Sequence, residues 1–292
     1  MKVLVAGATG AVGRHVVRQL LTAGHSVRAL SRNLRALAGL GSHELHAADL
    51  TQPDQLNGAC AGIDAVIACA GASLQIGAFS QRAGFLAVDY EGNRNLLAEA
   101  RRAGVSRFIY ISLAGATAVP NSEYAQAHER FAVELAGCGT AFTIIRSTGF
   151  FSAFAGLLPL ARAGIVPLVG AGLARTNPIH EADVAQACVE ALSGREESHT
   201  IGGPEIFTRH RLAEMAFDAI SKPPRLLSLP SALLLAAVPL CRPIHSWLAA
   251  LVHLTLLGTQ VDMVAPIYGA RRLGDYLRCA TAGGAAPLFS RY

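Results

Sequence analysis

The sequence predicts an α/β fold built on a doubly wound parallel sheet, because apolar runs and amphipathic helical patterns alternate along its first half. Six runs are short, apolar and bounded by turn residues, as buried parallel strands are. They are Val3–Ala6, Ser26–Leu30, Glu44–Ala47, Ala65–Cys69, Phe108–Ser112 and Phe142–Arg146. Helical periodicity separates them, most clearly over Arg14–Ala23, Tyr90–Ala103 and Ser122–Ala136. Gly24 and Gly104 follow two of these helices, where a left-handed residue commonly ends a helix.

The second half is less regular and is predicted to form a smaller, partly interleaved, substrate-binding portion. Ten prolines between positions 159 and 266 divide it into short segments. We expect residues 1–150, together with about 176–205, to form a sheet domain of the Rossmann type. Residues 151–175 and 206–292 would form the smaller apolar portion. In such folds, ligands bind at the carboxyl ends of the parallel strands.

A glycine loop directly follows the first predicted strand and precedes the first predicted helix. Its sequence is Gly7-Ala8-Thr9-Gly10-Ala11-Val12-Gly13. Gly7 permits the tight turn, Gly10 lets the backbone approach a pyrophosphate, and Gly13 lets the helix pack on the strand. The helix then presents free N–H groups and the positive end of its dipole to phosphates. Since strand, loop and helix occur in this order, the pattern predicts a dinucleotide site rather than a purely structural turn.

Composition and charge exclude several classes of function. The 292 residues can bury a large core, and 52% are hydrophobic whereas only 15% are charged, which is unusually apolar. The net charge is +5, but the basic residues are scattered, so we predict no nucleic-acid partner. The six cysteines form no C-x-x-C pair, and we predict neither a metal site nor a disulfide framework. Because the first strand begins at residue 2, we expect no signal peptide and a cytoplasmic location.

Charge at the end of the second strand favours NADP(H) over NAD(H). An NAD site of this kind places an acidic residue there, which accepts hydrogen bonds from the ribose 2′-hydroxyl. Here the segment is Leu30-Ser31-Arg32-Asn33, and no aspartate or glutamate occurs from residue 1 to 43. Arg32 is predicted to pair with a 2′-phosphate, with Arg14 and Arg35 close by. The alternative is that Arg32 is only a solvated loop charge.

Two further apolar runs, Ser231–Cys241 and Trp247–Gly258, are separated by a segment that contains Arg242 and Pro243. Each is shorter than the roughly 20 residues that span a bilayer. We expect core helices or a homodimer face over residues 231–258. The alternatives are a peripheral membrane contact or an apolar substrate tunnel.

Several motifs together resemble the short-chain dehydrogenase/reductase superfamily. They are Gly7-x-x-Gly10-x-x-Gly13, Asp49-Leu50 after the third strand, and Ala70-Gly71-Ala72 after the fourth. Residues 88–97, 103–112, 143–146 and 177–185 resemble its atypical, NmrA-like branch of NAD(P)H-binding proteins. That branch includes relatives that bind large hydrophobic molecules or associate with membrane complexes.

The resemblance implies which residues bind the cofactor. They are Gly7, Thr9, Gly10, Ala11, Val12, Gly13, Ser31, Arg32, Asp49, Leu50, Ala70 and Gly71. Asp49 would lie beside the adenine. The same residue is also typical of a turn or helix cap in Asp49-Leu50-Thr51-Gln52-Pro53, and both roles can hold at once.

The resemblance also implies a catalytic Tyr-x-x-x-Lys pair, whose spacing puts both side chains on one helical face. In the family, the lysine binds the nicotinamide ribose and lowers the tyrosine pKa. The matching segment here is Tyr124-Ala125-Gln126-Ala127-His128, and the only lysines of the chain are Lys2 and Lys222. Tyr124 is therefore expected to be the proton donor or only to line the cofactor. His128 would either replace the lysine or have no acid–base role.

Three other residues are expected near this centre. Ser112 ends the fifth strand near the expected nicotinamide, although Leu113 is the alternative match to the family's catalytic serine or threonine. Asp89 stands where many relatives have a helix asparagine that supports a proton-relay water. His180 precedes a helix led by Asp183 and is interpreted as a structural turn residue.

Three functions are compatible with these patterns. Phe150, Phe151 and Phe154 follow the sixth strand and indicate a hydrophobic substrate, unless they pack the two portions together. The favoured hypothesis is an NADPH-dependent reductase of a carbonyl or activated double bond. The second is a non-catalytic NADP(H)-binding regulator or redox sensor, which the missing lysine supports. The third is a membrane-associated accessory protein that docks through residues 231–258.

Overall fold

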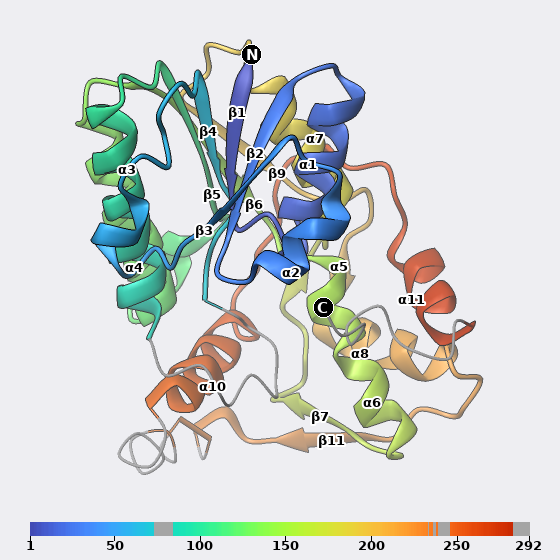
Figure 1. Cartoon of the computed structure of the whole chain (residues 1–292). Coiled ribbons are helices and arrows are strands. Elements are labelled where there is room, and N and C mark those ends of the chain that lie inside the picture. Colours follow the sequence, from blue (N-terminus) through green and yellow to red (C-terminus); the bar gives the residue numbers. More distant parts are fainter. Residues whose placement is uncertain (73–83, 233, 236–237, 239–245, 283–292) are drawn as a thin grey trace.

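A computed structural model describes residues 1–72, 84–232, 234–235, 238 and 246–282. Seven parallel strands form its central sheet in the order β3-β2-β1-β4-β5-β6-β9 (Figure 1). They are β1 Lys2–Ala6, β2 Ser26–Ser31, β3 Glu44–Ala47, β4 Ala65–Ala68, β5 Arg107–Leu113, β6 Ala141–Ser147 and β9 Ser198–Ile201. The strand order reverses beside β1, where doubly wound sheets bind nucleotides. The predicted fold class is thus confirmed.

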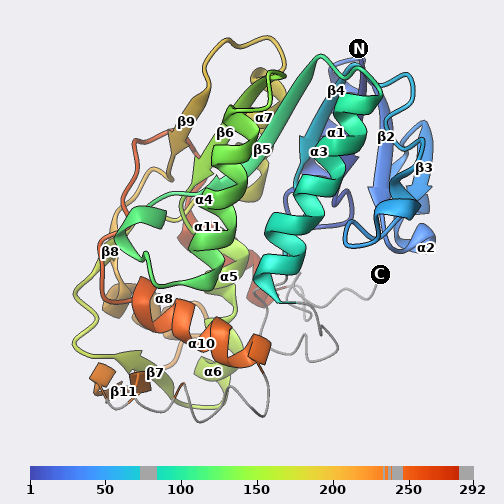
Figure 2. The same ribbon diagram turned by 90° about the vertical axis from the view of Figure 1, so that its left-hand side faces the viewer.

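Helices cover both faces of the sheet. α1 (Gly13–Thr22) and α7 (Glu181–Glu190) cover one face, and α3 (Asn93–Arg102) and α4 (Glu123–Ala136) cover the other, as Figure 1 and Figure 2 show. Alternate residues of β1 belong to the two apolar cores on either side of the sheet. β4 is apolar throughout, and β1 is apolar apart from Lys2, because both faces of these strands are buried.

Two elements differ from the sequence prediction. β9 pairs in parallel with β6 but was not predicted, because Ser198–Ile201 is short and mostly polar. The helix predicted from Tyr90 begins earlier, as a π-helix over Leu86–Gly92 that continues into α3. Gly24 and Gly104 have φ values of +79° and +73° and end α1 and α3, as predicted.

Most of the remaining elements lie beyond the carboxyl ends of the sheet (Figure 1). The helices are α2 Leu34–Leu37, α5 Phe151–Ala155, α6 Leu157–Arg162, α8 Arg209–Asp218, α10 Ser246–Gly258 and α11 Leu273–Ala282, with 3-10 turns at Ala38–Leu40, Pro53–Leu56 and Ala116–Ala118. β7 (Val166–Val169) pairs in parallel with β11 (Leu226–Leu229). β8 (Arg175–Thr176) pairs with β10 (Phe207–Thr208) in the antiparallel sense.

A separate apolar core holds α5, α6, α8, α11 and β7 together. Fully buried Asn177 connects the neighbouring loops to the sheet domain. Its Nδ2 donates to the carbonyls of Gly203 at 3.0 Å and Ala265 at 2.8 Å, and its Oδ1 accepts from the Ala265 amide at 3.0 Å. One side chain thus fixes three segments that are distant in the sequence.

The apolar region 231–258 is only partly described. Residues 233, 236–237 and 239–245, which include part of the Ser231–Cys241 run, lie outside the described residues. α10 packs against α4, buries Ala249 and Leu256, and leaves Val252 40% exposed. In the part of the chain that the structure describes, no helix is both long and apolar enough to cross a membrane.

Candidate cofactor and active site

The glycine loop packs too tightly for side chains at two of its glycines. Gly7 has φ +77°, and a Cβ there would lie 2.7 Å from the Ala70 nitrogen. A Cβ on Gly13 would overlap the Gly7 carbonyl oxygen. At Gly10 the same oxygen would lie 3.1 Å away, which is a milder restriction. The fold itself therefore requires Gly7 and Gly13, whereas an approaching pyrophosphate remains the expected reason for Gly10.

The N-terminus of α1, directly behind the loop, is available to an anion. Val12 at its N-cap provides no side-chain cap, and the first turn holds no acidic residue. The amides of Arg14 and His15 donate to the carbonyls of Gly10 and Val12, whereas those of Ala11, Val12 and Gly13 have no acceptor among the described residues. These free amides and the helix dipole favour a phosphate at this position. The Arg14 guanidinium adds positive charge, since it donates to the carbonyls of Thr9 at 3.0 Å and Gly10 at 3.3 Å.

The loop is joined to the carboxyl end of β2, where cofactor preference is expected to be set. Thr9 Oγ1 and Ser31 Oγ lie 2.9 Å apart, and the amides of Gly7 and Ala8 donate to a carbonyl of β2. Arg32 follows and is exposed, and none of the described residues pairs with its guanidinium. Its side chain is therefore free for either predicted role.

The other predicted cofactor residues lie at the ends of β3 and β4. Asp49 Oδ1 accepts from the amide and the hydroxyl of Thr51 at 2.9 and 2.8 Å, which forms the turn that the sequence suggested. Leu50 is buried, whereas Gly71 is exposed next to Ala70. The structure thus brings the predicted cofactor residues to the carboxyl ends of four neighbouring strands, β1 to β4.

α4 carries Tyr124 and His128 one turn apart. Their rings meet edge to face with centroids 4.4 Å apart, and the Phe85 ring lies 5.1 Å from that of Tyr124. Burial raises the pKa of Tyr124 well above its usual value, and the nearby Asp89 adds to this rise. Tyr124 is therefore a protonated phenol at neutral pH.

His128 faces the core and is held by Tyr110 of β5. Its Nδ1 lies 2.5 Å from the Tyr110 hydroxyl, and only 5% of the residue is exposed. Burial lowers the pKa of His128 to about 3, with a further contribution from Arg146. Burial also holds the pKa of Tyr110 well above its usual value. The phenol thus donates to a neutral imidazole, which leaves the imidazole proton on Nε2.

Asp89 lies next to this imidazole, on the π-helix. It is fully buried, and its carboxylate accepts from the Ala72 amide at 3.1 and 3.3 Å. Burial raises the pKa of Asp89 to about 7, although the Ala72 amide acts in the opposite direction. A Cβ on Gly71 would lie 2.7 Å from Asp89 Oδ1. Glycine is therefore needed for the segment that follows β4 to approach the carboxylate.

Ser112, near the carboxyl end of β5, lies on the same strand face as Tyr110. It is 3% exposed, and its hydroxyl has no hydrogen-bond partner among the described residues. Buried hydroxyls are nearly always paired, so an unpaired one beside the predicted active site is a candidate contact for a bound molecule.

The phenylalanines after β6 pack the two portions of the chain together. Phe151 is 1% exposed, and its ring lies 5.4 Å from that of His180 and 5.5 Å from that of Tyr276. Phe150 and Phe154 pack against two different apolar cores. The His180 Nδ1 accepts a backbone N–H of α7 at 3.0 Å, so this residue caps a helix, in agreement with its interpretation as a turn residue.

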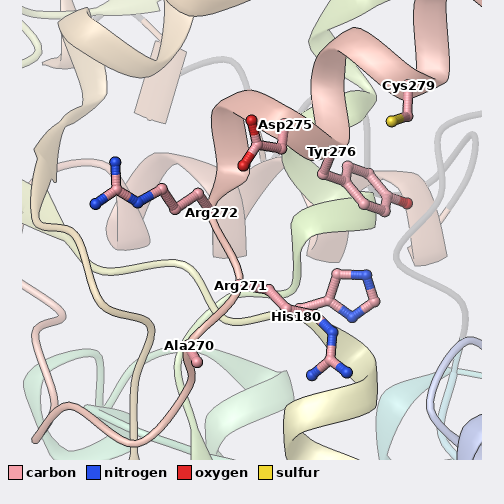
Figure 3. A pocket seen from close by; sticks show the side chains of 7 residues that line it. All are labelled: His180, Ala270, Arg271, Arg272, Asp275, Tyr276 and Cys279. Carbon is pink, nitrogen blue, oxygen red and sulfur yellow. The ribbon is translucent and has the colours of Figure 1, made fainter.

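An open pocket of about 560 Å³ lies between α7 and α11 (Figure 3). Its lining is His180, Ala270, Arg271, Arg272, Asp275, Tyr276 and Cys279. None of these was predicted to bind cofactor or to act in catalysis. Arg271 is ion-paired with Asp183, and Asp275 with Arg278. Across the described ranges, no cluster of three or more His, Cys, Asp or Glu residues could hold a metal ion.

Sequence reasoning missed Tyr110, the partner of His128. The alternation of side chains along β5 could have identified it, because alternate residues of a strand share a face and Phe108, Tyr110 and Ser112 therefore lie together. A buried tyrosine needs a partner for its hydroxyl, and the facing helix offers His128.

Comparison with known proteins identifies the type of domain. A family model described as NAD(P)H-binding matches residues 7–195, which is more than half of the chain. The match begins in the glycine loop and ends just beyond α7.

Individual relatives are similar over much of the chain. A divinyl chlorophyllide a 8-vinyl-reductase of Oryza sativa subsp. indica is 30% identical over 81% of this chain and 63% of its own length. Subunit 9 of the NADH dehydrogenase [ubiquinone] 1 alpha subcomplex of Arabidopsis thaliana is 28% identical over 77% of this chain and 60% of its own. The chain therefore spans about three fifths of these relatives. An Escherichia coli NADPH-dependent quinone oxidoreductase, solved with NADPH, shares the fold with TM-score 0.73, 22% identity, and coverage of 96% of this chain and 100% of its own.

Proposed function

Since this chain belongs to the NAD(P)H-binding family, we propose that it is an NADPH-dependent oxidoreductase. It would reduce a carbonyl group or an activated carbon–carbon double bond of a hydrophobic small molecule. The proposal rests above all on the phosphate cradle at the end of β1. There Gly7 and Gly13 pack without side chains, the N-terminus of α1 is uncapped, and Arg14 is held against the loop. These residues fit the pyrophosphate of a dinucleotide.

NADPH is proposed over NADH because of the charge beyond β2. Arg32 is exposed and has no partner among the described residues, and no carboxylate precedes residue 44. A guanidinium pairs with a 2′-phosphate through charge-assisted hydrogen bonds. An acidic residue, which the 2′-hydroxyl of NADH would favour, is missing from this position.

Tyr124 is proposed as the proton donor. A bound reduced nicotinamide would supply a hydride to the substrate. Tyr124 would give its phenol proton to the substrate oxygen or carbon, and the phenolate would then recover a proton from water. Neutral His128 provides no cation to stabilise the phenolate, so we expect proton transfer to be slower than with a lysine at this position.

The substrate is proposed to be hydrophobic on two grounds. The chain is rich in apolar residues beyond the carboxyl ends of the sheet, where relatives place substrate contacts. Two similar proteins carry names that state reduction of a quinone and of a vinyl group. We therefore propose quinones and conjugated enones as the first compounds to test.

The first test is a titration of the purified protein with NADPH and NADH, followed by nicotinamide fluorescence, on wild type, Arg32→Ala and Arg18→Ala. Exposed Arg18 lies on α1 away from the loop and serves as the matched control. We expect NADPH to bind more tightly than NADH, and Arg32→Ala to weaken NADPH by about 10- to 150-fold, equivalent to about 1.5–3 kcal/mol for a hydrogen bond to a charged group. NADH binding should not change. Equal affinities for both cofactors would contradict the role of Arg32.

A second candidate is a non-catalytic accessory protein that holds NADP(H) and docks on a membrane complex or a second copy of itself through residues 231–258. One observation favours this candidate. His128 stands where the family has a lysine, and it is buried and hydrogen-bonded to Tyr110. The name of the Arabidopsis relative describes a subunit of a larger complex. Tight NADPH binding with no oxidation of NADPH by quinones or enones, together with flotation on liposomes, would favour this candidate over the reductase.

A further inference from the structure

Asp89, His128 and Tyr110 form a buried group directly beside Tyr124. Asp89 and Tyr110 have no exposed surface, and His128 is 5% exposed. The three residues come from the π-helix, α4 and β5. His128 Nδ1 lies 2.5 Å from the Tyr110 hydroxyl, and its Nε2 lies 3.5 Å from Asp89 Oδ1. The two ring nitrogens therefore face two different core residues.

The number of protons on this group decides its charge. An ionised Asp89 beside a neutral imidazole would be a buried negative charge, and within the described ranges only the Ala72 amide donates a hydrogen bond to it. An uncompensated buried charge is costly. One proton, placed on either Asp89 or His128, makes the pair neutral overall.

Among the residues that the structure describes, no other charged group near the pair is free to compensate it. Arg146 of β6 and Glu129 of α4 face this region and are ion-paired with each other. Asn93 of α3 donates through Nδ2 to the Asp89 backbone carbonyl, not to its carboxylate. Among the described residues, His128 Nε2 has no hydrogen-bond partner of ordinary geometry.

We propose that Asp89 and His128 act as one positioning unit that holds a single proton, and that Tyr124 donates its own proton efficiently only while the unit holds it. The second half of this statement rests on the proposed reductase function. The physical reason is like-charge repulsion. Tyr124 becomes a phenolate when it protonates a substrate, and an ionised Asp89 nearby would destabilise that phenolate.

The unit also lies directly behind the predicted cofactor site. A Cβ on Gly71 would lie 2.7 Å from Asp89 Oδ1, and the next amide, that of Ala72, donates to the same carboxylate. Gly71 is one of the residues predicted to bind cofactor. The carboxyl group of Asp89 is thus close to Tyr124 and also to the segment after β4, so its charge affects the electrostatic potential at both.

The folded unit keeps its proton over a wide pH range. The pKa of Asp89 is raised from 3.8 to about 7, and that of His128 is lowered from 6.5 to about 3. The folded pair therefore holds one proton, on Asp89, from about pH 3 to pH 7. The unfolded pair also holds one proton, on the imidazole, from pH 3.8 to 6.5. Equal proton counts mean that the pair adds no pH dependence to stability in this window.

Single replacements should therefore produce opposite pH slopes. In Asp89→Asn, only the unfolded state takes up a proton below pH 6.5, so stability relative to wild type falls as pH falls. In His128→Gln, only the folded state keeps the proton of Asp89 between pH 3.8 and 7, so relative stability falls as pH rises. Each slope approaches a tenfold change in the unfolding equilibrium constant per pH unit.

The first experiment is urea unfolding of wild type and both variants from pH 4.5 to 7, with Asp54→Asn, an exposed carboxylate, as the control. Opposite slopes for the two variants support the unit. Parallel or flat slopes overturn it. Wild-type ¹⁵N-histidine NMR tests, without substitution, the assignment of that proton to Asp89. A neutral His128 with its proton on Nε2 at pH 6 is expected, and a doubly protonated imidazole would contradict the assignment.

The second experiment is NADPH oxidation with a quinone from pH 5.5 to 9. Wild-type kcat should fall as pH rises through about 7, as Asp89 ionises. Asp89→Asn should lose that fall, with kcat of both proteins measured at saturating NADPH at every pH. An unchanged alkaline fall in Asp89→Asn would overturn the link to Tyr124. If the wild type binds NADPH but oxidises none, both the reductase proposal and the link between Asp89 and Tyr124 are overturned. The unfolding data would then still decide whether the pair holds one proton.

Discussion

Position 128 shows how one side chain alters the chemistry that a fold can perform. A lysine there would bring a cation beside Tyr124, whereas His128 is neutral and has Nδ1 held by Tyr110 at 2.5 Å. Without a cation, the pKa of Tyr124 stays raised by burial. A raised pKa makes this phenol a weaker acid, and it leaves little phenolate to act as a base at neutral pH. We therefore expect proton transfer in either direction to be slower than with a lysine at this position.

Replacing Tyr124 by Phe should separate the two candidate functions. If Tyr124 is the proton donor, Tyr124→Phe lowers kcat for quinone or enone reduction by about 10²-fold or more, as loss of a general acid does. NADPH affinity should change little. Tyr90→Phe is the control, because the Tyr90 hydroxyl on the π-helix donates to Glu134 of α4. Equal kcat values for Tyr124→Phe and wild type would assign Tyr124 to the lining of the site only.

Among the elements, the turn from β1 into α1 is set by two glycines that touch. A Cβ at Gly13 would overlap the Gly7 carbonyl oxygen, so the helix can approach the strand only without a side chain there. The same close approach directs the uncapped start of α1 toward the carboxyl end of the sheet. Strand, turn and helix thus form one rigid cradle.

Replacing Gly13 by Ala should disturb this cradle selectively. The added methyl group forces the backbone apart, so we expect a loss of about 1–3 kcal/mol in stability, typical of overpacking, and at least tenfold weaker NADPH binding. Urea unfolding and fluorescence titration measure the two effects. Gly39→Ala is the control, because a Cβ at Gly39 meets nothing within 4 Å. Wild-type affinity in Gly13→Ala would mean that the cofactor does not use this cradle.

Over the whole molecule, the sheet domain and the loops beyond it are connected through buried polar contacts as well as apolar packing. Asn177 holds the segments around Gly203 and Ala265. Phe151 packs with His180 and Tyr276 between α5, α7 and α11. The portion that would cover a substrate is therefore anchored to the sheet at more than one place.

Replacing Asn177 by Ala should weaken this connection. Removing the amide leaves two buried carbonyls and one buried amide unpaired, so we expect a loss of about 2–4 kcal/mol in stability. Asn121→Ala, at an exposed position, should change stability by less than about 0.5 kcal/mol. Chemical denaturation of both variants measures the difference. A loss in Asn177→Ala no larger than that of the control would show that water or rearranged loops satisfy the exposed groups.

The sequence by itself determined the doubly wound, parallel type of the sheet and the place of the glycine loop, because these depend on local patterns. Apolar runs, helical periodicity and the spacing of Gly7, Gly10 and Gly13 are all visible within short windows. β9 was missed because four mostly polar residues carry no strand signal and become a strand only by pairing with β6. The π-helix was missed because apolar periodicity over a short window does not distinguish a π-turn from an α-turn.

Only the tertiary structure decided what surrounds His128. Tyr110 and Asp89 are distant from it in the sequence and come from different elements. Burial lowers the pKa of the His128 imidazole and raises that of the Asp89 carboxyl group. Desolvation depends on what packs around a group from every side, which a sequence window does not contain. Asp89, Tyr124 and His128 could thus be predicted near the site, whereas the contact with Tyr110 and the pKa shifts followed from the fold.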